Sequence, residues 1–193
     1  MKIGLFFGSF NPIHIGHLLL ATHLREAAQL DEIWFVVSPQ NPFKLNTELA
    51  DENHRLEMVK LAITNVSYFK AVDIEFQLPE PSYTHITLKE LTQKHPENKF
   101  HLIIGEDNVA KFNEWKEVDW ITDNFEVLVY SRKVNSMQYA VEKSDDSRFT
   151  TINSKMLDIS STEIRNRIKN HQSIQYFVTE NVEHYITFHK LFQ

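Results

Sequence analysis

The stretch GSFNPIHIGH, residues 8–17, joins an apolar run to a helical segment near the start of the chain. Residues 2–7 (KIGLFF) predict a buried strand, and residues 17–29 (HLLLATHLREAAQ) place leucines and alanines on one side of a helix. Gly8 and Ser9 would form a tight turn whose backbone N–H groups face a ligand. This order of strand, glycine turn and helix indicates a parallel sheet that binds its ligand at the helix N-terminus.

His14 and His17 are three residues apart, so in a first helical turn both imidazoles would project from the same side. Two ring N–H donors there can bind a phosphate at the positive end of the helix. Gly16 allows a ligand to approach closely, and Pro12 restricts Asn11 and stiffens the entry. The alternatives are two ordinary polar residues at a helix start, or a zinc site whose third ligand the sequence does not identify.

Strand-like and helical segments alternate along the rest of the chain. Further strands are expected at residues 32–38, 68–73, 100–105, 125–131 and 149–153, and further helices at 51–65, 84–95, 161–170 and 179–190. The alternation predicts an α/β fold, a parallel sheet with helices on both faces. We expect one domain over residues 1–193, with a helical C-terminal portion at 158–193. Residues 135–147 are polar and aperiodic and predict a surface excursion.

Composition is that of an ordinary globular protein. The chain has 193 residues, 42% hydrophobic and 24% charged, enough to bury its own core. It has no cysteine, so disulfides and thiolate chemistry are excluded. The net charge of −6 disfavours broad contact with a nucleic-acid backbone. With no signal-like segment and no run of roughly 18 apolar residues, we expect a cytoplasmic protein with neither a membrane nor a nucleic-acid partner.

Residues 159–165 (ISSTEIR) form a second polar cluster at the start of a predicted helix. Ser160, Ser161 and Thr162 supply an N-cap and further hydroxyls there. Arg165 lies one turn past Thr162 and would face the same way. Hydroxyls, free N–H groups and a guanidinium at a helix N-terminus can hold a polyphosphate. The alternative is a serine-capped helix with an exposed arginine.

These two clusters resemble known motifs. Gly8-x-Phe10-x-Pro12-x-His14-x-Gly16-His17 is similar to the GxFxPxHxGH signature of the HxGH nucleotidyltransferases, especially the nicotinate/nicotinamide mononucleotide adenylyltransferases, and residues 159–165 resemble their ISxTxxR motif. PSYT at 81–84 and IIGED at 103–107 resemble further segments of that family. The resemblance implies a Rossmann-like fold and transfer of AMP from ATP to nicotinate mononucleotide, with release of pyrophosphate, in NAD biosynthesis.

The resemblance also implies a set of site residues between residues 3 and 170. Those implied to bind ATP are Gly8, Ser9, Phe10, Gly16, Gly105, Asp107, Ser160, Ser161, Thr162 and Arg165. Those implied to bind the pyridine nucleotide are Ser9, Lys44, Tyr83, Thr84 and Trp115. His14, His17, Lys44 and Arg165 are implied to be catalytic. No residue is implied to bind a metal, because Mg²⁺ would arrive on the ATP phosphates.

Several of these residues have plainer interpretations. Tyr83 and Trp115 can be core aromatics, Asp107 can cap a helix, and Lys44 can be a solvated lysine. Many bacterial members of the family carry a histidine just before that lysine, where this chain has Phe43.

Two other functions stay open at this stage. One is another HxGH nucleotidyl transfer, such as adenylylation of nicotinamide mononucleotide or of pantetheine phosphate. The other is a nucleic-acid-binding module derived from a synthetase-like domain, since HIGH is also a mark of class I aminoacyl-tRNA synthetases. The sequence does not decide whether the protein forms a homo-oligomer.

Overall fold

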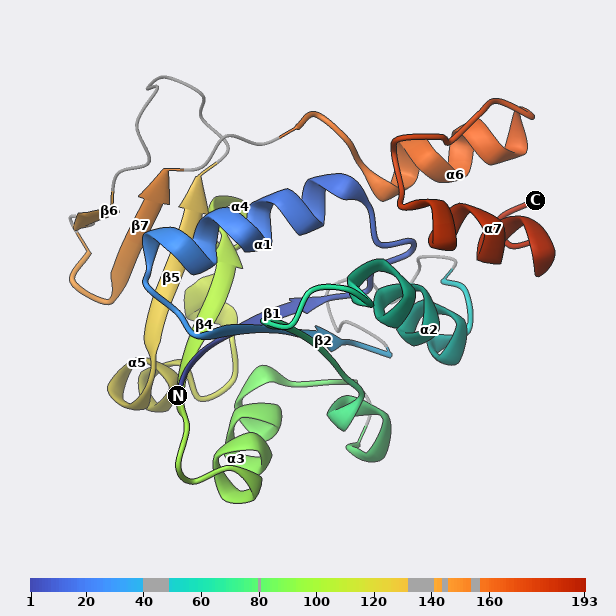
Figure 1. Cartoon of the computed structure of the whole chain (residues 1–193). Helices are drawn as coiled ribbons and strands as arrows, with labels where there is room; N and C mark the ends of the chain where they lie inside the picture. The colour runs from blue at the N-terminus through green and yellow to red at the C-terminus, as the bar shows by residue number, and fades with distance from the viewer. Residues whose placement is uncertain (40–48, 80, 132–140, 144–145, 154–156) are drawn as a thin grey trace.

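The structure is a computed structural model that describes residues 1–39, 49–79, 81–131, 141–143, 146–153 and 157–193. Its centre is a seven-stranded sheet in the order β3-β2-β1-β4-β5-β7-β6 (Figure 1). The strands are β1 (Lys2–Gly8), β2 (Glu32–Val37), β3 (Phe69–Val72), β4 (Lys99–Gly105), β5 (Glu126–Ser131), β6 (Val141–Lys143) and β7 (Phe149–Asn153). All neighbours pair in parallel except β6, which pairs antiparallel with β7 at the edge.

Helices cover both faces of this sheet (Figure 1). They are α1 (Ile15–Ala27), α2 (Glu52–Ile63), α3 (Thr84–Lys94), α4 (Glu106–Val109), α5 (Val118–Asn124), α6 (Ser161–Lys169) and α7 (Glu180–Phe188), with 3₁₀ turns η2 (Ile74–Gln77) and η3 (Phe112–Glu114). One apolar core lies between the sheet and α1, α2, α6 and α7, and a second lies between the sheet and α3 and α5. This explains why β1 is apolar on both sides: Leu5 belongs to the second core and Phe6 to the first.

The strand order reverses at β1. The chain runs outward through β2 and β3 on one side of β1, and then returns to place β4 on the other side. In an open parallel sheet this reversal leaves a crevice at the carboxyl ends of the two strands that diverge. The loops after β1 and β4 are therefore the places where a ligand site is expected.

The predicted segments are found to within two residues at either end, and the α/β fold is confirmed. Asp51 caps α2 as expected, because its side chain accepts a hydrogen bond from the Asn53 N–H. The helices α4 and α5 were not predicted, since four and seven residues are too few to show a helical period.

The expectation of a plain surface excursion at residues 135–147 is wrong in part, because β6 forms within it and extends the sheet. The rest of that segment lies largely outside the described residues. The single domain with a helical C-terminal portion stays a prediction. Within the described residues, no helix is both long enough and apolar enough to cross a membrane.

Candidate active site

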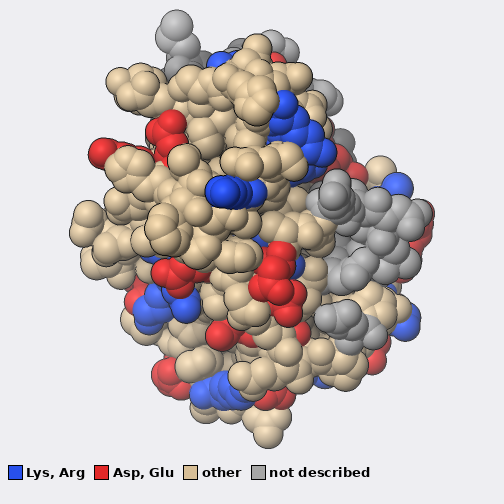
Figure 2. All heavy atoms as spheres, turned by 90° about the vertical axis from the view of Figure 1, so that its right-hand side faces the viewer, with Lys and Arg blue, Asp and Glu red and all other residues tan. Residues whose placement is uncertain are grey.

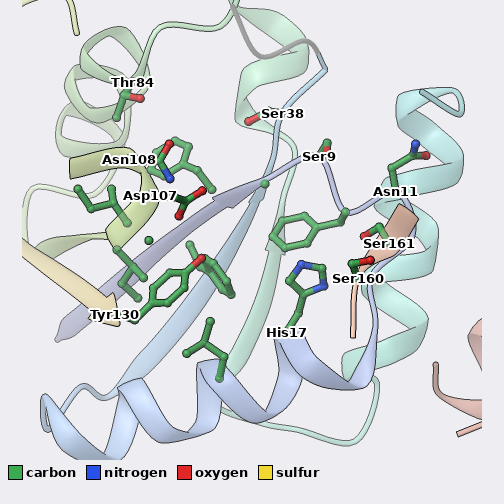
Figure 3. Close-up of a pocket in the computed structure, with 18 of the residues that line it drawn as sticks. Ser9, Asn11, His17, Ser38, Thr84, Asp107, Asn108, Tyr130, Ser160 and Ser161 are labelled. Carbon is green, nitrogen blue, oxygen red and sulfur yellow. The ribbon is translucent and has the colours of Figure 1, made fainter. Parts of the chain in front are cut away.

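A cleft of about 1030 Å³ opens at the carboxyl ends of β1 and β4, a volume suited to a nucleotide-sized ligand. Every described residue that was expected to bind a substrate or to be catalytic lines it: Gly8, Ser9, Phe10, His14, Gly16, His17, Tyr83, Thr84, Gly105, Asp107, Trp115, Ser160, Ser161, Thr162 and Arg165. In Figure 3, the labelled lining residues come from several elements, and His17 rises from α1 between Tyr130 on one side and Ser160 and Ser161 on the other. Lys44 lies outside the described residues.

The two histidines stack on each other at the start of α1, with ring centroids 3.6 Å apart. The helix begins at Ile15, so His17 stands in its first turn, as its spacing from His14 predicts. The His14 backbone N–H donates to Nδ1 of His17 over 3.3 Å. A neutral His17 therefore carries its proton on Nε2, which makes that nitrogen a hydrogen-bond donor. A Cβ at residue 16 would lie 3.0 Å from the His14 ring, so Gly16 makes room for the pair.

The Phe10 side chain packs against His17. Its ring is buried and meets the His17 ring edge-on, with centroids 5.3 Å apart. The residue has φ 44°, a left-handed conformation that costs a non-glycine residue energy and is typical of functional turns.

The second motif, residues 159–165, is hydrogen-bonded directly to the first, residues 8–17. Ser160 caps α6 by accepting from the Glu163 N–H, and the Ser161 hydroxyl donates to the Pro12 carbonyl over 2.9 Å. Arg165 donates from Nη1 to the Asn11 carbonyl over 2.8 Å and from Nη2 to the Thr162 hydroxyl over 3.2 Å. Ser161 and Arg165 thus hold the two motifs together, and Thr162 and Arg165 both line the cleft.

At the other end of the cleft lie the first turn of α3 and the loop around η3. Tyr83 is the N-cap of α3, and Lys116 sits over its ring with Nζ 3.8 Å from the centroid. Tyr83 and Trp115 are half-buried and both line the cleft, so neither is an ordinary core aromatic. This end offers aromatic faces, helix N–H groups and a positive charge.

Asp107 lies in the first turn of α4, whose N-cap is Gly105. The alternative in which Asp107 caps a helix is therefore wrong. A Cβ at residue 105 would collide with the Asp107 carboxylate, so the glycine is needed for that carboxylate to sit where it does. Figure 3 shows Asp107 and Asn108 together at one wall of the cleft.

Sequence reasoning missed a buried carboxyl group beside the first turn of α3. Glu75, in η2, is 2% exposed and accepts from the Thr87 hydroxyl over 2.8 Å. Burial raises the pKa of Glu75, and the hydroxyls of Thr87, Ser38 and Ser82 offset part of that rise. A 3₁₀ turn of four residues shows no periodic pattern, so nothing in the sequence indicated that Glu75 is buried.

A buried arginine was also missed. Arg55 is 1% exposed, although the sequence alone makes it look like a solvated helix residue. The signal was present: Arg55, Leu56, Val59 and Ile63 fall on one face of α2 and all are buried. Among the described residues, no group of three or more His, Cys, Asp or Glu side chains is arranged to hold a metal ion.

Comparison with known proteins shows which family the chain resembles. The family model described as Cytidylyltransferase-like matches residues 5–167. A protein of Cytophaga hutchinsonii named "Probable nicotinate-nucleotide adenylyltransferase" is 46% identical over 192 residues, covering 100% of this chain and 98% of that protein. A protein of the same name from Flavobacterium johnsoniae is 45% identical over 186 residues, 96% of each chain.

Solved structures agree in fold. The nicotinic acid mononucleotide adenylyltransferase of Plasmodium falciparum, complexed with NaAD, superposes with a TM-score of 0.77 at 22% identity, over 99% of this chain and 97% of that one. A Vibrio parahaemolyticus structure described as a "Putative Nicotinate-nucleotide Adenylyltransferase" gives a TM-score of 0.71 at 21% identity, over 99% of this chain and 94% of that one. With a family model matched over residues 5–167 and relatives matched over the full length, this chain belongs to the cytidylyltransferase-like family and, within it, to the nicotinate-nucleotide adenylyltransferases.

Proposed function

We propose that this protein transfers AMP from ATP to nicotinate mononucleotide, giving nicotinate adenine dinucleotide and pyrophosphate. The observation that carries the proposal is the junction of the two motifs. Arg165 and Ser161 of the second motif bond to the carbonyls of Asn11 and Pro12 in the first. One cleft therefore offers donors to several phosphates at once, next to an aromatic end that suits a pyridine ring.

The chemistry needs no strong base, because the attacking 5′-phosphate is already an anion. It attacks the α-phosphorus of ATP, the bond to the bridging oxygen breaks, and pyrophosphate leaves with the electron pair. Catalysis then rests on positioning and on stabilising the charge that develops. His17 donates from Nε2 to the α-phosphate, and the stacked His14 holds its ring in place.

Thr162 and Arg165 hold the leaving pyrophosphate. The guanidinium already spans Asn11 and Thr162, so it is fixed at the N-terminus of α6, where the helix dipole also favours anions. Lys44 is assigned to the same phosphates by its place in the sequence.

Mg²⁺ would enter with ATP, bound to the phosphates, and would neutralise the charge of the departing pyrophosphate. Asp107 lines the cleft with its carboxylate in place, a group that suits a partly hydrated Mg²⁺. Its other assigned partner is a ribose hydroxyl of the adenosine.

At the pyridine end, the N–H groups at the start of α3 favour the carboxylate of nicotinate over a neutral amide. Lys116, stacked on Tyr83, adds a positive charge on the same side. Trp115 would cover the ring. These features support nicotinate mononucleotide as the preferred acceptor. A reaction whose substrates are ATP and a free mononucleotide also supports a cytoplasmic location.

A pyrophosphate-release assay with ATP and Mg²⁺ against a panel of acceptors tests the proposal. Nicotinate mononucleotide should react fastest, ahead of nicotinamide mononucleotide and of pantetheine phosphate. Pyrophosphate release with pantetheine phosphate alone would overturn the assignment in favour of the rival transfer.

The nucleic-acid-binding rival is tested separately. On the face shown in Figure 2, Lys and Arg alternate with Asp and Glu rather than forming a continuous basic surface, and the net charge is −6. A tRNA gel-shift at physiological salt should therefore show no complex, and a shifted band at low protein concentration would revive that rival.

A further inference from the structure

Arg55 is a buried cation whose hydrogen bonds all go to main-chain carbonyls. Nε donates to Ala50 over 2.9 Å, Nη1 to Ser9 over 2.8 Å and to Ser38 over 2.6 Å, and Nη2 to Pro39 over 2.9 Å. None of the salt bridges between described residues involves it. A buried charge of this kind is costly, so its retention calls for a reason beyond packing.

The four carbonyls belong to the segments that frame the cleft. Ser9 follows β1, Ser38 and Pro39 follow β2, and Ala50 precedes α2. Ser9 and Ser38 both line the cleft, while the guanidinium lies buried behind them. One planar side chain thus fixes the ends of two adjacent parallel strands relative to each other.

The hydrogen bond from Arg55 to the Ser9 carbonyl also orients a peptide group. In a trans peptide the N–H points opposite to the C=O, so the Phe10 N–H is directed away from Arg55 when the Ser9 carbonyl is bound to it. Since Arg55 is buried behind a loop that lines the cleft, we infer that this N–H points toward the cleft. The left-handed φ of 44° at Phe10 is a conformation that must be held by its surroundings, and the bond to Ser9 holds the peptide just before it.

A chain of hydrogen bonds connects Arg55 to the second motif. The Ala50 carbonyl accepts from Arg55, the Ala50 N–H donates to Oδ1 of Asn11 over 3.1 Å, and the Asn11 carbonyl accepts from Arg165. The residue that we assign to the leaving pyrophosphate is therefore fixed to the same framework as the loop that receives the α-phosphate.

We propose that Arg55 is a positioning residue for adenylyl transfer, which holds the loops after β1 and β2 in register with Arg165 and places a positive charge behind the phosphates. It contacts no substrate itself. The inference rests on the proposed function for its effect on catalysis, but its effect on the loops can be measured without any substrate.

The test is Arg55→Lys, which keeps the charge but cannot reproduce a planar fork that reaches four carbonyls. We expect kcat to fall at least about tenfold, because small misplacements of reacting groups are costly, and to fall more than the KM values for ATP and nicotinate mononucleotide rise. Activity is measured at a temperature at which circular dichroism shows the variant fully folded. Arg25→Lys is the matched control, since Arg25 also donates to a main-chain carbonyl, that of Asp31, and does not line the cleft.

Hydrogen exchange gives the readout that does not depend on activity. In Arg55→Lys, amides of residues 8–11 should exchange faster while those of β4 keep their protection. A folded variant with normal kcat and unchanged exchange at 8–11 would overturn the proposal, as would an equal loss of kcat in Arg25→Lys. An inactive wild type would defeat the proposed function, yet local loosening at 8–11 would still be seen if Arg55 positions the loop.

A second variant covers the case in which Arg55→Lys does not fold. Asn11→Ala removes the bond from the Ala50 N–H and leaves Arg55 intact. We expect a folded protein with kcat reduced several-fold, because the link between Arg55 and Arg165 is broken. A folded Asn11→Ala with wild-type kcat would contradict the positioning role.

Discussion

At the scale of single residues, transition-state stabilisation is assigned chiefly to the His17 imidazole. We predict that His17→Ala lowers kcat by roughly 10²-fold or more, the range found when one donor to a developing charge is removed. The fold should survive, because the ring is only half-buried and stacks mainly on His14. Steady-state kinetics and thermal unfolding of the same preparation check both expectations.

The matched control for that variant is His184→Ala, since His184 is exposed on α7 and does not line the cleft. Its kcat should equal that of the wild type. Near-normal turnover in His17→Ala would show that His17 is simply a residue at a helix start.

Arg165 is predicted to act on ATP rather than on the acceptor. Arg165→Ala should raise KM for ATP and lower kcat/KM, because the fork at the start of α6 is lost. Arg165→Lys should recover part of the lost kcat/KM, since the ammonium keeps the positive charge but lacks the planar guanidinium that makes two hydrogen bonds. Arg167, on the same helix, donates to Ser173 and does not line the cleft, so Arg167→Lys should leave KM for ATP unchanged. An unchanged KM in Arg165→Ala would remove Arg165 from the site.

At the scale of elements, the first turn of α3 is tied to η2 through Glu75, and this contact should depend on pH. Because burial raises the folded-state pKa of Glu75 above its ordinary 4.5, the native state binds that proton more tightly than the unfolded state. The stabilisation is complete below the ordinary value and is lost as pH rises through the raised one. Glu75→Gln stays neutral and keeps an acceptor for Thr87, so its stability relative to wild type should increase as pH rises.

Denaturant unfolding of both proteins between pH 4 and roughly pH 8 measures this difference. Glu117→Gln supplies a control of opposite sign. The hydrogen bond from Lys89 lowers the pKa of Glu117, so its stabilisation is present above the ordinary value and is lost as pH falls. Parallel stability curves for wild type and Glu75→Gln would contradict the account of a buried, proton-binding Glu75.

The elements themselves were largely predictable, because β1, α1 and their neighbours are long enough to show their periods. The motif residues were predictable as well, since their spacing repeats a known pattern. What the sequence could not show was contact between distant parts. The sequence places Arg55 on a helix, but only the structure shows that it donates hydrogen bonds to the carbonyls of Ser9 and Ser38. The bond from the Ser161 hydroxyl to the Pro12 carbonyl was equally hidden, because only the fold brings residues 12 and 161 together.

At the scale of the whole molecule, the proposed function gives the cleft a phosphate-binding end and a pyridine-binding end, and the second should select the acceptor. One well-placed charge-assisted hydrogen bond contributes about 1.5–3 kcal/mol, so we predict at least a roughly tenfold preference in kcat/KM for nicotinate over nicotinamide mononucleotide. Side-by-side kinetics at matched Mg²⁺ and pH measure it. Equal values would indicate dual specificity, and a preference for the amide would overturn the role given to the Tyr83–Thr84 turn.

The central claim is that the AMP part of ATP passes to the phosphate of nicotinate mononucleotide. It is tested most directly by following labelled phosphorus with the purified protein, Mg²⁺ and both substrates. Label at the α-position of ATP should appear in nicotinate adenine dinucleotide, and label at the γ-position should appear in pyrophosphate, in equal amounts. If the α-label stays in ATP, or is released as AMP while no dinucleotide forms, the account is contradicted.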